Sequence, residues 1–255
     1  SRNSIASSIY FGFGDYELDL MKGNQAIVEE YHAVGSLKLG LFLSKHNNKA
    51  LSNSGGVCFV SQYRSQMVNS SEQVNVKFTG IVRDVYRQLV DYTSVNKYKL
   101  YVTMFHHKGE DDYTKELDFF KSIVNSDRVE FLPNSKSRYS SYKASIKSEV
   151  IVTMDSTLGF EMFGCGKKIL FCSPIDPVFA KMRGVEGLFE KMPNLVKLQG
   201  SLSTQLTELM NIDNAQYNKI VGNARAYFMK SGKPYPHEII SSYVFNAITE
   251  GVSES

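Results

Sequence analysis

The sequence predicts an α/β fold in which a doubly wound parallel sheet is followed by C-terminal helices. Apolar runs of about five residues alternate with segments of helical periodicity, which is typical of a parallel sheet covered by helices. Most of these runs do not alternate polar with apolar residues, so we expect both faces of the sheet to be buried. The 255 residues, 42% of them hydrophobic and 22% charged, suffice for one large domain or two small ones.

The order of the elements can be read along the chain. Strands are expected at Val57–Ser61, Lys99–Phe105, Val129–Leu132, Val150–Met154, Lys168–Cys172 and Leu195–Leu198. Helices are expected at about Gly80–Val95, Asp112–Asn125, Tyr139–Ile146, Leu158–Cys165, Leu202–Leu209, Asn214–Met229 and His237–Thr249. This order predicts a Rossmann-like domain with a helical tail.

The first fifty residues have a different character. Ser1–Glu30 has few periodic apolar positions and lacks the pattern of a strand–helix–strand unit. Tyr31–Leu37 is expected to form a short strand running into a turn, and Leu51–Gly56 a polar linker. We therefore divide the chain into residues 1–50, the end of a preceding domain with an interdomain crossover, and residues 51–255, the domain of the sheet.

Charge and composition exclude several classes of protein. The formal net charge of +3 is spread along the chain without basic blocks, so nucleic-acid binding is not expected, although anionic ligands are favoured. No apolar run approaches the ~20 residues that span a bilayer, and the first residues lack a signal-peptide pattern. Cys58, Cys165 and Cys172 form no CxxC pair and are expected to be buried free thiols of a reducing, cytoplasmic compartment.

Ligands of open α/β sheets bind outside the carboxyl ends of the strands, and the loop after the fourth predicted strand has the sharpest pattern there. Asp155, Ser156 and Thr157 begin a helix, whose free N–H groups and dipole suit an anion. Gly159 leaves room for a ligand, and Glu161 can accept both hydroxyls of a ribose. The alternative is that Asp155 or Ser156 is only an N-cap and Glu161 a capping-box partner.

The loop after the first predicted strand carries Ser61, Gln62 and Arg64. An arginine beside hydroxyl and amide donors suits phosphate or carboxylate binding, because the guanidinium presents two parallel donors. A solvated loop arginine is the alternative.

The loop after the second predicted strand carries His106, His107 and Lys108. Neighbouring histidines in an extended chain point to opposite sides, so only one of the two can face the crevice. A metal site from the two histidines and Asp111 lacks a fixed ligand spacing, and we expect no metal.

The run from Asp155 to Phe171 resembles the donor-binding motif in the C-terminal domain of GT-B glycosyltransferases. In that motif a small polar loop precedes a helix with a Glu and, five residues later, a Gly; the matching residues are Ser156, Thr157, Gly159, Glu161 and Gly166. The chain is most similar to bacterial surface-carbohydrate transferases, including those that move acidic keto-sugars such as Kdo from CMP. The resemblance implies that Ser156 and Thr157 hold the donor phosphate and that Glu161 holds the ribose.

Two weaker similarities concern other loops. The histidine pair resembles the His that follows the corresponding strand of CMP-dependent sialyl- and glycerophosphate transferases. The run Val34–Lys38 is similar to the segment where Kdo transferases cross between domains, which implies that Gly35, Ser36 and Lys38 face an interdomain cleft. A bare turn is the alternative for that run.

The resemblance implies a metal-independent glycosyltransferase of lipopolysaccharide or other surface-polysaccharide biosynthesis. A GT-B enzyme needs two such domains, so the chain is expected to be its donor-binding half. The implied partners are a CMP- or UDP-linked sugar, with no further cofactor, and a glycan or lipid-linked acceptor. Peripheral association with the inner face of the membrane would reside in the other half. His106, His107 and Asp155 are the catalytic candidates on this chain. The alternatives are a CDP-polyol phosphotransferase of similar fold and a non-catalytic nucleotide-binding module.

Overall fold

The computed structural model describes residues 6–46, 55–135, 139–183 and 187–253. The chain divides into two compact units, one of Leu51–Val221 and the other of Ser1–Ala50 together with Gly222–Ser255. The residues from Gly222 onward thus group with the N-terminal segment and not, as expected from the sequence, with the domain of the sheet. Most of the polar linker expected at 51–56 lies outside the described residues.

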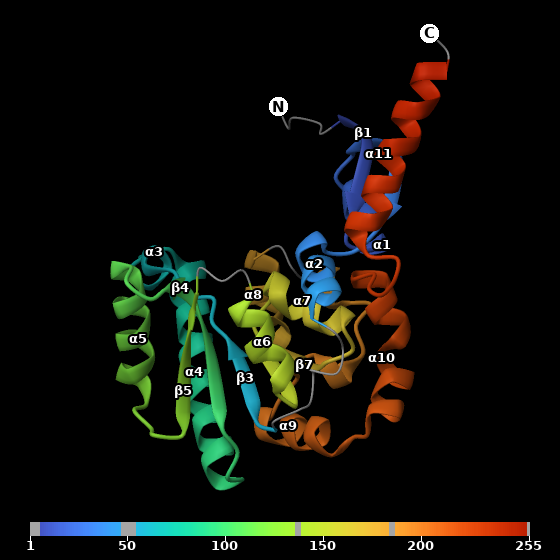
Figure 1. Ribbon diagram of the computed structural model, residues 1–255. Coiled ribbons are helices and arrows are strands. Elements are labelled where there is room, and N and C mark those ends of the chain that lie inside the picture. Colours follow the sequence, from blue (N-terminus) through green and yellow to red (C-terminus); the bar gives the residue numbers. More distant parts are fainter. Residues whose placement is uncertain (1–5, 47–54, 136–138, 184–186, 254–255) are drawn as a thin grey trace. The chain divides into compact units, whose positions relative to one another are not determined.

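The larger unit contains a five-stranded parallel sheet in the order β5-β4-β3-β6-β7 (Figure 1). The strands are β3 (Val57–Val60), β4 (Leu100–His107), β5 (Val129–Asn134), β6 (Val150–Thr153) and β7 (Lys168–Phe171). The chain runs outward from β3 to β5 and then restarts on the other side of β3 with β6, so the sheet is doubly wound. The predicted fold class and the first five predicted strands are confirmed.

Helices connect these strands and close over the sheet. They are α3 (Ser65–Val68), α4 (Gln73–Val95), α5 (Asp111–Ile123), α6 (Ser140–Lys147), α7 (Thr157–Gly164), α8 (Pro177–Arg183), α9 (Leu202–Asn211) and α10 (Asn214–Phe228), with short 3-10 helices η2 (Ser173–Ile175), η3 (Gly187–Phe189) and η4 (Asn194–Val196). Every residue of β3, β6 and β7 is buried, because helices cover both faces of a doubly wound sheet. The uninterrupted apolar runs in the sequence reflect this burial.

The sixth predicted strand, Leu195–Leu198, was wrong. This segment forms η4, and it meets the sheet only through one parallel bridge between Phe171 and Lys197, beside which the Leu198 N–H donates to the Phe171 carbonyl at 2.8 Å. The apolar side chains of the segment are buried. A short buried run has the same composition in a core turn as in a strand, and periodicity does not separate the two.

The smaller unit contains a strand–helix–strand unit where none was predicted. It consists of β1 (Ala6–Gly12), α1 (Asp15–Gly23) and β2 (Ile27–Ala33), and the two strands pair in parallel with Phe11 opposite His32. The expectation for Ser1–Glu30 was therefore wrong. The unit was not predicted because its two strands are partly solvent-exposed and include polar residues such as Ser8 and Glu29, so neither forms an apolar run.

Two helices of the smaller unit complete its packing. α2 (Leu37–Lys45) follows β2 directly, and the side chains of α11 (Pro236–Ser253) reach β1 and β2. The Tyr243 hydroxyl donates to Glu30 at 2.5 Å, and the Tyr243 ring meets Phe11 edge-on at 5.5 Å. None of the helices within the described ranges is long and apolar enough to cross a bilayer.

Candidate functional site

The order of the sheet reverses between β3 and β6, and the carboxyl ends of these neighbouring strands form the switch point at which open α/β sheets bind ligands. The loops after β3, β4, β6 and β7 all leave the sheet at this edge, because the strands are parallel. Three of the four loops singled out in the sequence, those after β3, β4 and β6, thus share one edge of the larger unit.

The loop after β6 is built around Ser156, which caps α7. Its Oγ accepts the Gly159 N–H at 3.1 Å and lies 2.8 Å from the Oγ1 of Thr153. Thr157, the first residue of α7, is exposed. Ser156 therefore has a capping role, and the exposed Thr157 begins the helix at the sheet edge, where helix N-termini favour anions.

Gly159 is buried against the sheet. A Cβ at this position would lie 2.6 Å from Cγ2 of Thr153 and 3.2 Å from Cε1 of Phe171. Glycine is thus needed here for α7 to pack closely on β6 and β7, and this close packing positions the start of the helix at the sheet edge.

A hydrogen-bond network joins the loop after β6 to the loops after β3 and β7. The side chain of Gln62 donates to Asp155 Oδ1 at 2.8 Å and accepts the backbone N–H of Asp155 at 3.0 Å, and the Ser173 hydroxyl donates to Asp155 Oδ2 at 2.8 Å. Asp155 is therefore held in place from both neighbouring loops. Ser173 was not singled out in the sequence, although it follows a predicted strand and the strand-end criterion would have found it.

Glu161 lies in the buried part of α7, with 5% of its surface exposed. Its Oε2 accepts the hydroxyl of Tyr142 at 2.7 Å. Because Tyr142 is on α6, this bond joins the two helices. Arg138, which the sequence suggests as a neighbour of a bound base together with Tyr139 and Tyr142, lies outside the described residues.

A buried carboxylate organises the ends of β3 and β4. Glu116 of α5 is fully buried, and it accepts hydrogen bonds from the Ser61 hydroxyl and from the backbone N–H groups of Phe105 (2.9 Å) and His106 (3.0 Å). Burial raises the pKa of Glu116, and these donors oppose that shift. Nothing in the sequence pattern marked this residue, since a glutamate on a helix usually faces solvent.

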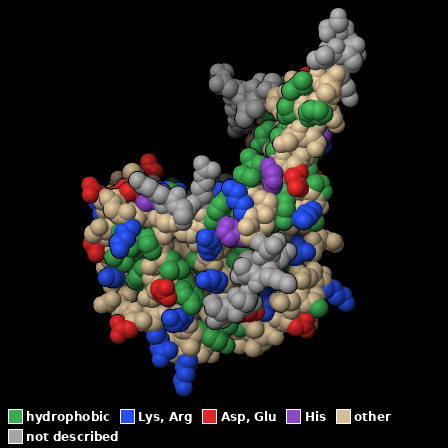
Figure 2. Space-filling model, in the orientation of Figure 1, with side chains coloured by type: hydrophobic (Ala, Val, Ile, Leu, Met, Phe, Trp, Pro, Cys, Tyr) green, Lys and Arg blue, Asp and Glu red, His purple; other side chains and the backbone are tan. Residues whose placement is uncertain are grey.

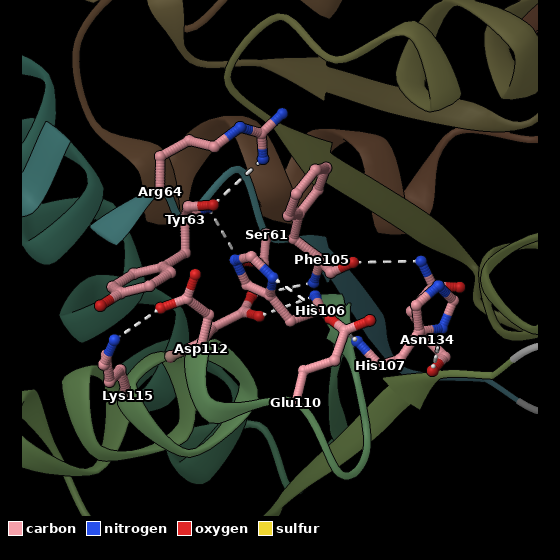
Figure 3. Close-up of polar contacts among 11 residues, drawn as sticks. Ser61, Tyr63, Arg64, Phe105, His106, His107, Glu110, Asp112, Lys115 and Asn134 are labelled. Carbon is pink, nitrogen blue, oxygen red and sulfur yellow. Dashed lines mark hydrogen bonds and ion pairs between the residues drawn. The ribbon is translucent and has the colours of Figure 1, made fainter. Parts of the chain in front are cut away.

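Arg64 lies flat on an aromatic ring at this edge. Its guanidinium carbon is 3.3 Å from the centroid of Phe105, and its Nη1 donates to the backbone carbonyl of Tyr63 at 3.1 Å (Figure 3). Partial burial lowers the pKa of Arg64 below its ordinary value, but an arginine remains charged at neutral pH. Its orientation is thus fixed by stacking.

The two histidines after β4 have different surroundings. The Nδ1 of His107 lies 2.9 Å from the backbone carbonyl of Asn134 on β5, whereas the Nδ1 of His106 lies 3.6 Å from Glu110. The Nε2 of His106 is buried and has no hydrogen-bond partner in the described part of the chain. Lys108, next in the loop, is exposed. Of the two, His106 is thus the histidine whose unpartnered ring nitrogen is buried.

The fourth loop singled out in the sequence lies in the smaller unit. Ser36 caps α2 by accepting the Leu39 N–H at 3.2 Å, and Lys38 is exposed. Gly35 has a φ of +91°, and a Cβ there would lie 2.1 Å from the carbonyl oxygen of Lys230. Local packing within the unit therefore accounts for the glycine and the serine.

The described ranges contain no group of three or more His, Cys, Asp or Glu that could hold a metal ion. Among the described residues no cysteine forms a disulfide; Cys58 and Cys172 are buried, and Cys165 is partly exposed. Burial raises the pKa of the Cys58 thiol to about 11.

Solved structures share this fold at low sequence identity. A UDP-GlcNAc 2-epimerase of Methanocaldococcus jannaschii, solved with UDP-GlcNAc and UDP, is 9% identical over 94% of this chain and 61% of its own, with a TM-score of 0.58. A variant of the wall teichoic acid polymerase TagF is 13% identical over 95% of this chain and 58% of its own, with a TM-score of 0.55. S. aureus MnaA, solved with UDP, is 13% identical over 95% of this chain and 60% of its own, also at 0.55. The likeness shows a Rossmann-like α/β fold of the GT-B type, and the chain spans about three-fifths of these proteins.

No curated protein matches the sequence. A family model described as "putative O-antigen biosynthesis protein" matches residues 21–176. This match runs from within α1 to just beyond η2 and contains all the strand-end loops described above. It covers more than half of the chain, which therefore belongs to this family of O-antigen biosynthesis proteins.

Proposed function

We propose that the chain binds a nucleotide-linked sugar and is the donor-binding half of a glycosyltransferase that builds a bacterial surface polysaccharide. The observation that carries this proposal is the switch point, because the start of α7 and the loops that hold Arg64 and His106 all lie at the same edge of the sheet. Membership in a family of O-antigen biosynthesis proteins supports the pathway class. Fold neighbours solved with UDP-GlcNAc or UDP support a nucleotide-linked ligand.

The donor in this proposal is a CMP-linked acidic sugar such as CMP-Kdo. Ser156, Thr157 and the first turn of α7 hold the phosphate, and Glu161 holds the ribose. His106, His107 and Asp155 are the catalytic candidates, of which His106 has the uncommitted nitrogen. N–H groups of the helix start and hydroxyls stabilise the negative charge that grows on the phosphate as the sugar–phosphate bond breaks, so the reaction needs no metal.

A second candidate is transfer of a polyol phosphate from a CDP-linked donor. The fold likeness to TagF, one of whose structures was solved with CDPG, favours it. The same loops after β3, β4 and β6 would then hold a diphosphate. A nucleotide-binding module without catalysis is the outcome if the whole protein binds donor and transfers nothing.

The acceptor site and the general base are proposed to lie in a part of the protein beyond this chain, which would also carry any attachment to the inner face of the membrane. The smaller unit supports this view. Among the described residues its parallel sheet consists of β1 and β2, and such sheets rarely stand alone because both faces need cover. Ile9 and Ile27 on its strands are exposed, as are Phe245 and Ile248 on α11, where apolar side chains gather (Figure 2).

Nucleotide binding is the first test. Isothermal titration calorimetry of the 255-residue chain with CMP, CDP, UDP and GDP should detect binding of a pyrimidine nucleotide. Ser156→Ala combined with Thr157→Ala removes two hydroxyls near the phosphate and should weaken binding by roughly 1–3 kcal/mol.

The matched control is Ser201→Ala, which removes the same kind of N-cap from α9. Its Oγ accepts the Thr204 N–H at 3.4 Å, so the control shares the loss of a cap without touching the switch point. Equal affinity in the parent and the double variant would remove the phosphate site from α7.

The ribose role of Glu161 has its own test. Glu161→Gln keeps the size of the side chain and removes its charge, so the ribonucleotide should lose its advantage over the 2′-deoxy analogue. If the variant still discriminates as the parent does, Glu161 serves only to join α7 to Tyr142.

A further inference from the structure

The ends of β3 and β4 carry positive and donor groups that the chain itself does not neutralise. Glu116 is the acid whose charge acts on Arg64. Its two carboxylate oxygens, however, already accept three hydrogen bonds, from the Ser61 hydroxyl and two backbone N–H groups. Within the described ranges Arg64 forms no ion pair. The carboxylate of Glu116 is thus already occupied by hydrogen bonds from Ser61 and the backbone.

The guanidinium of Arg64 is oriented but mostly uncommitted. The Phe105 ring at 3.3 Å fixes its plane, and a single hydrogen bond to the Tyr63 carbonyl uses one of its five N–H donors (Figure 3). A guanidinium that is held in one plane, with its other N–H donors available, is preorganised to bind a carboxylate or a phosphate.

His106 adds a second uncommitted group at the same edge. Its backbone N–H is held by Glu116, its Nδ1 faces Glu110, and its buried Nε2 has no partner within the described residues. A buried ring nitrogen without a partner is costly, so a ligand group that bonds it is favoured.

These groups are separate from the start of α7. His106 belongs to β4, and so does Phe105, the residue over which the Arg64 guanidinium lies. β4 and β6 lie on opposite sides of β3, and neighbouring strands are about 4.8 Å apart, so the ends of β4 and β6 are about 10 Å apart. A single phosphate bound at Ser156 and Thr157 therefore leaves His106 and the fork of Arg64 without an anion.

We propose that Arg64 and His106 form a second anion subsite, which takes a second negatively charged group of the same donor. This inference rests on the proposed function. The group is an oxyanion on the side of the phosphate away from the nucleoside: the carboxylate of an acidic sugar, or the second phosphate of a diphosphate donor. Glu116 is the positioning residue, because it holds the backbone from which both side chains project.

The test compares ligands with one and two anionic groups. CMP, CDP and CMP-Kdo are titrated calorimetrically into the 255-residue chain and into its Arg64→Met variant. The parent should bind CDP or CMP-Kdo about tenfold or more tightly than CMP, and the variant should lose that advantage while its affinity for CMP stays within about twofold. Preference for CMP-Kdo identifies the carboxylate, and preference for CDP identifies the second phosphate.

Arg83→Met is the matched control. Arg83 also stacks on a ring, 4.6 Å from the centroid of Phe119, but it projects from α4 rather than from a strand-end loop. This variant should keep the parent's preference. Thermal unfolding of both variants verifies that they fold.

Three results would overturn the subsite. The first is equal affinity of the parent for all three ligands. The second is an Arg64→Met variant that still prefers CDP or CMP-Kdo to CMP. The third is a variant whose affinity for CMP falls as much as its affinity for CDP and CMP-Kdo, which would assign Arg64 to the first phosphate. A parent that binds no nucleotide at all refutes the proposed function, and the subsite with it.

Discussion

Replacing Glu116 by glutamine tests whether this buried carboxylate holds the site together. The substitution preserves volume but turns one acceptor oxygen into an NH2 group. If the remaining oxygen keeps the bonds from Ser61 and Phe105, the new NH2 faces the backbone N–H of His106, and two donors oppose each other. A buried N–H without an acceptor costs about 1–3 kcal/mol.

This loss in the free energy of unfolding should lower the Tm by a measurable amount. The unit of roughly 170 residues that contains Glu116 should lose about 2–4 °C in Tm per kcal/mol, so Glu116→Gln should melt about 2–12 °C lower. Circular dichroism is the suitable probe, because the chain has no tryptophan. The control Asp84→Asn removes an exposed carboxylate that pairs with Arg87 and should shift Tm by less than about 1 °C.

The parent and the Glu116→Gln variant should also differ in how their stability depends on pH. Burial raises the pKa of Glu116 in the folded state, so folding favours its protonated form. The stability gained from protonating Glu116 in the folded state is present in full below the ordinary pKa of a glutamate, and it is lost as pH rises through the raised pKa of Glu116. The difference in Tm between parent and variant should therefore be larger at pH 4.5 than at pH 8. Coincident melting curves at both pH values would refute the role assigned to Glu116.

Three further predictions concern packing and thiol reactivity. Gly159→Ala should destabilise by about 1–3 kcal/mol in denaturant titrations, because its Cβ would lie 2.6 Å from Thr153; an unchanged midpoint would mean that α7 can shift without cost. Gly80→Ala, inside α4 with nothing within 4 Å of the new Cβ, should stabilise by about 0.5–1 kcal/mol in the same assay, and a loss would contradict this packing. Cys165 should react first with Ellman's reagent at pH 8, whereas buried Cys58, with a pKa raised to about 11, should react only after denaturation; simultaneous reaction would contradict the burial.

Some elements were predictable because their burial leaves a direct trace in the sequence. β3, β6 and β7 are buried throughout, so at least three consecutive residues of each are apolar, and the edge where their loops meet follows from parallel pairing alone. The same criterion was wrong for Leu195–Leu198, whose apolar side chains are buried in a turn rather than in the sheet. It also missed β1, and it placed a strand at Tyr31–Leu37, which shares only its first three residues with β2, because the exposed faces of these strands carry no such runs.

Apolar patterning along the chain is therefore enough to predict the doubly wound sheet, the helices between its strands and the loops at its carboxyl edge. The contacts of each polar residue in those loops depend on the packed structure. The bond of Gln62 to Asp155 joins residues 93 apart in the chain, and that of Ser61 to Glu116 joins residues 55 apart. Apolar periodicity records which side chains are buried within one element, whereas a hydrogen bond depends on how separate elements pack. Only this packing shows that Glu116 is fully hydrogen-bonded, whereas Arg64 and His106 keep groups available for a ligand.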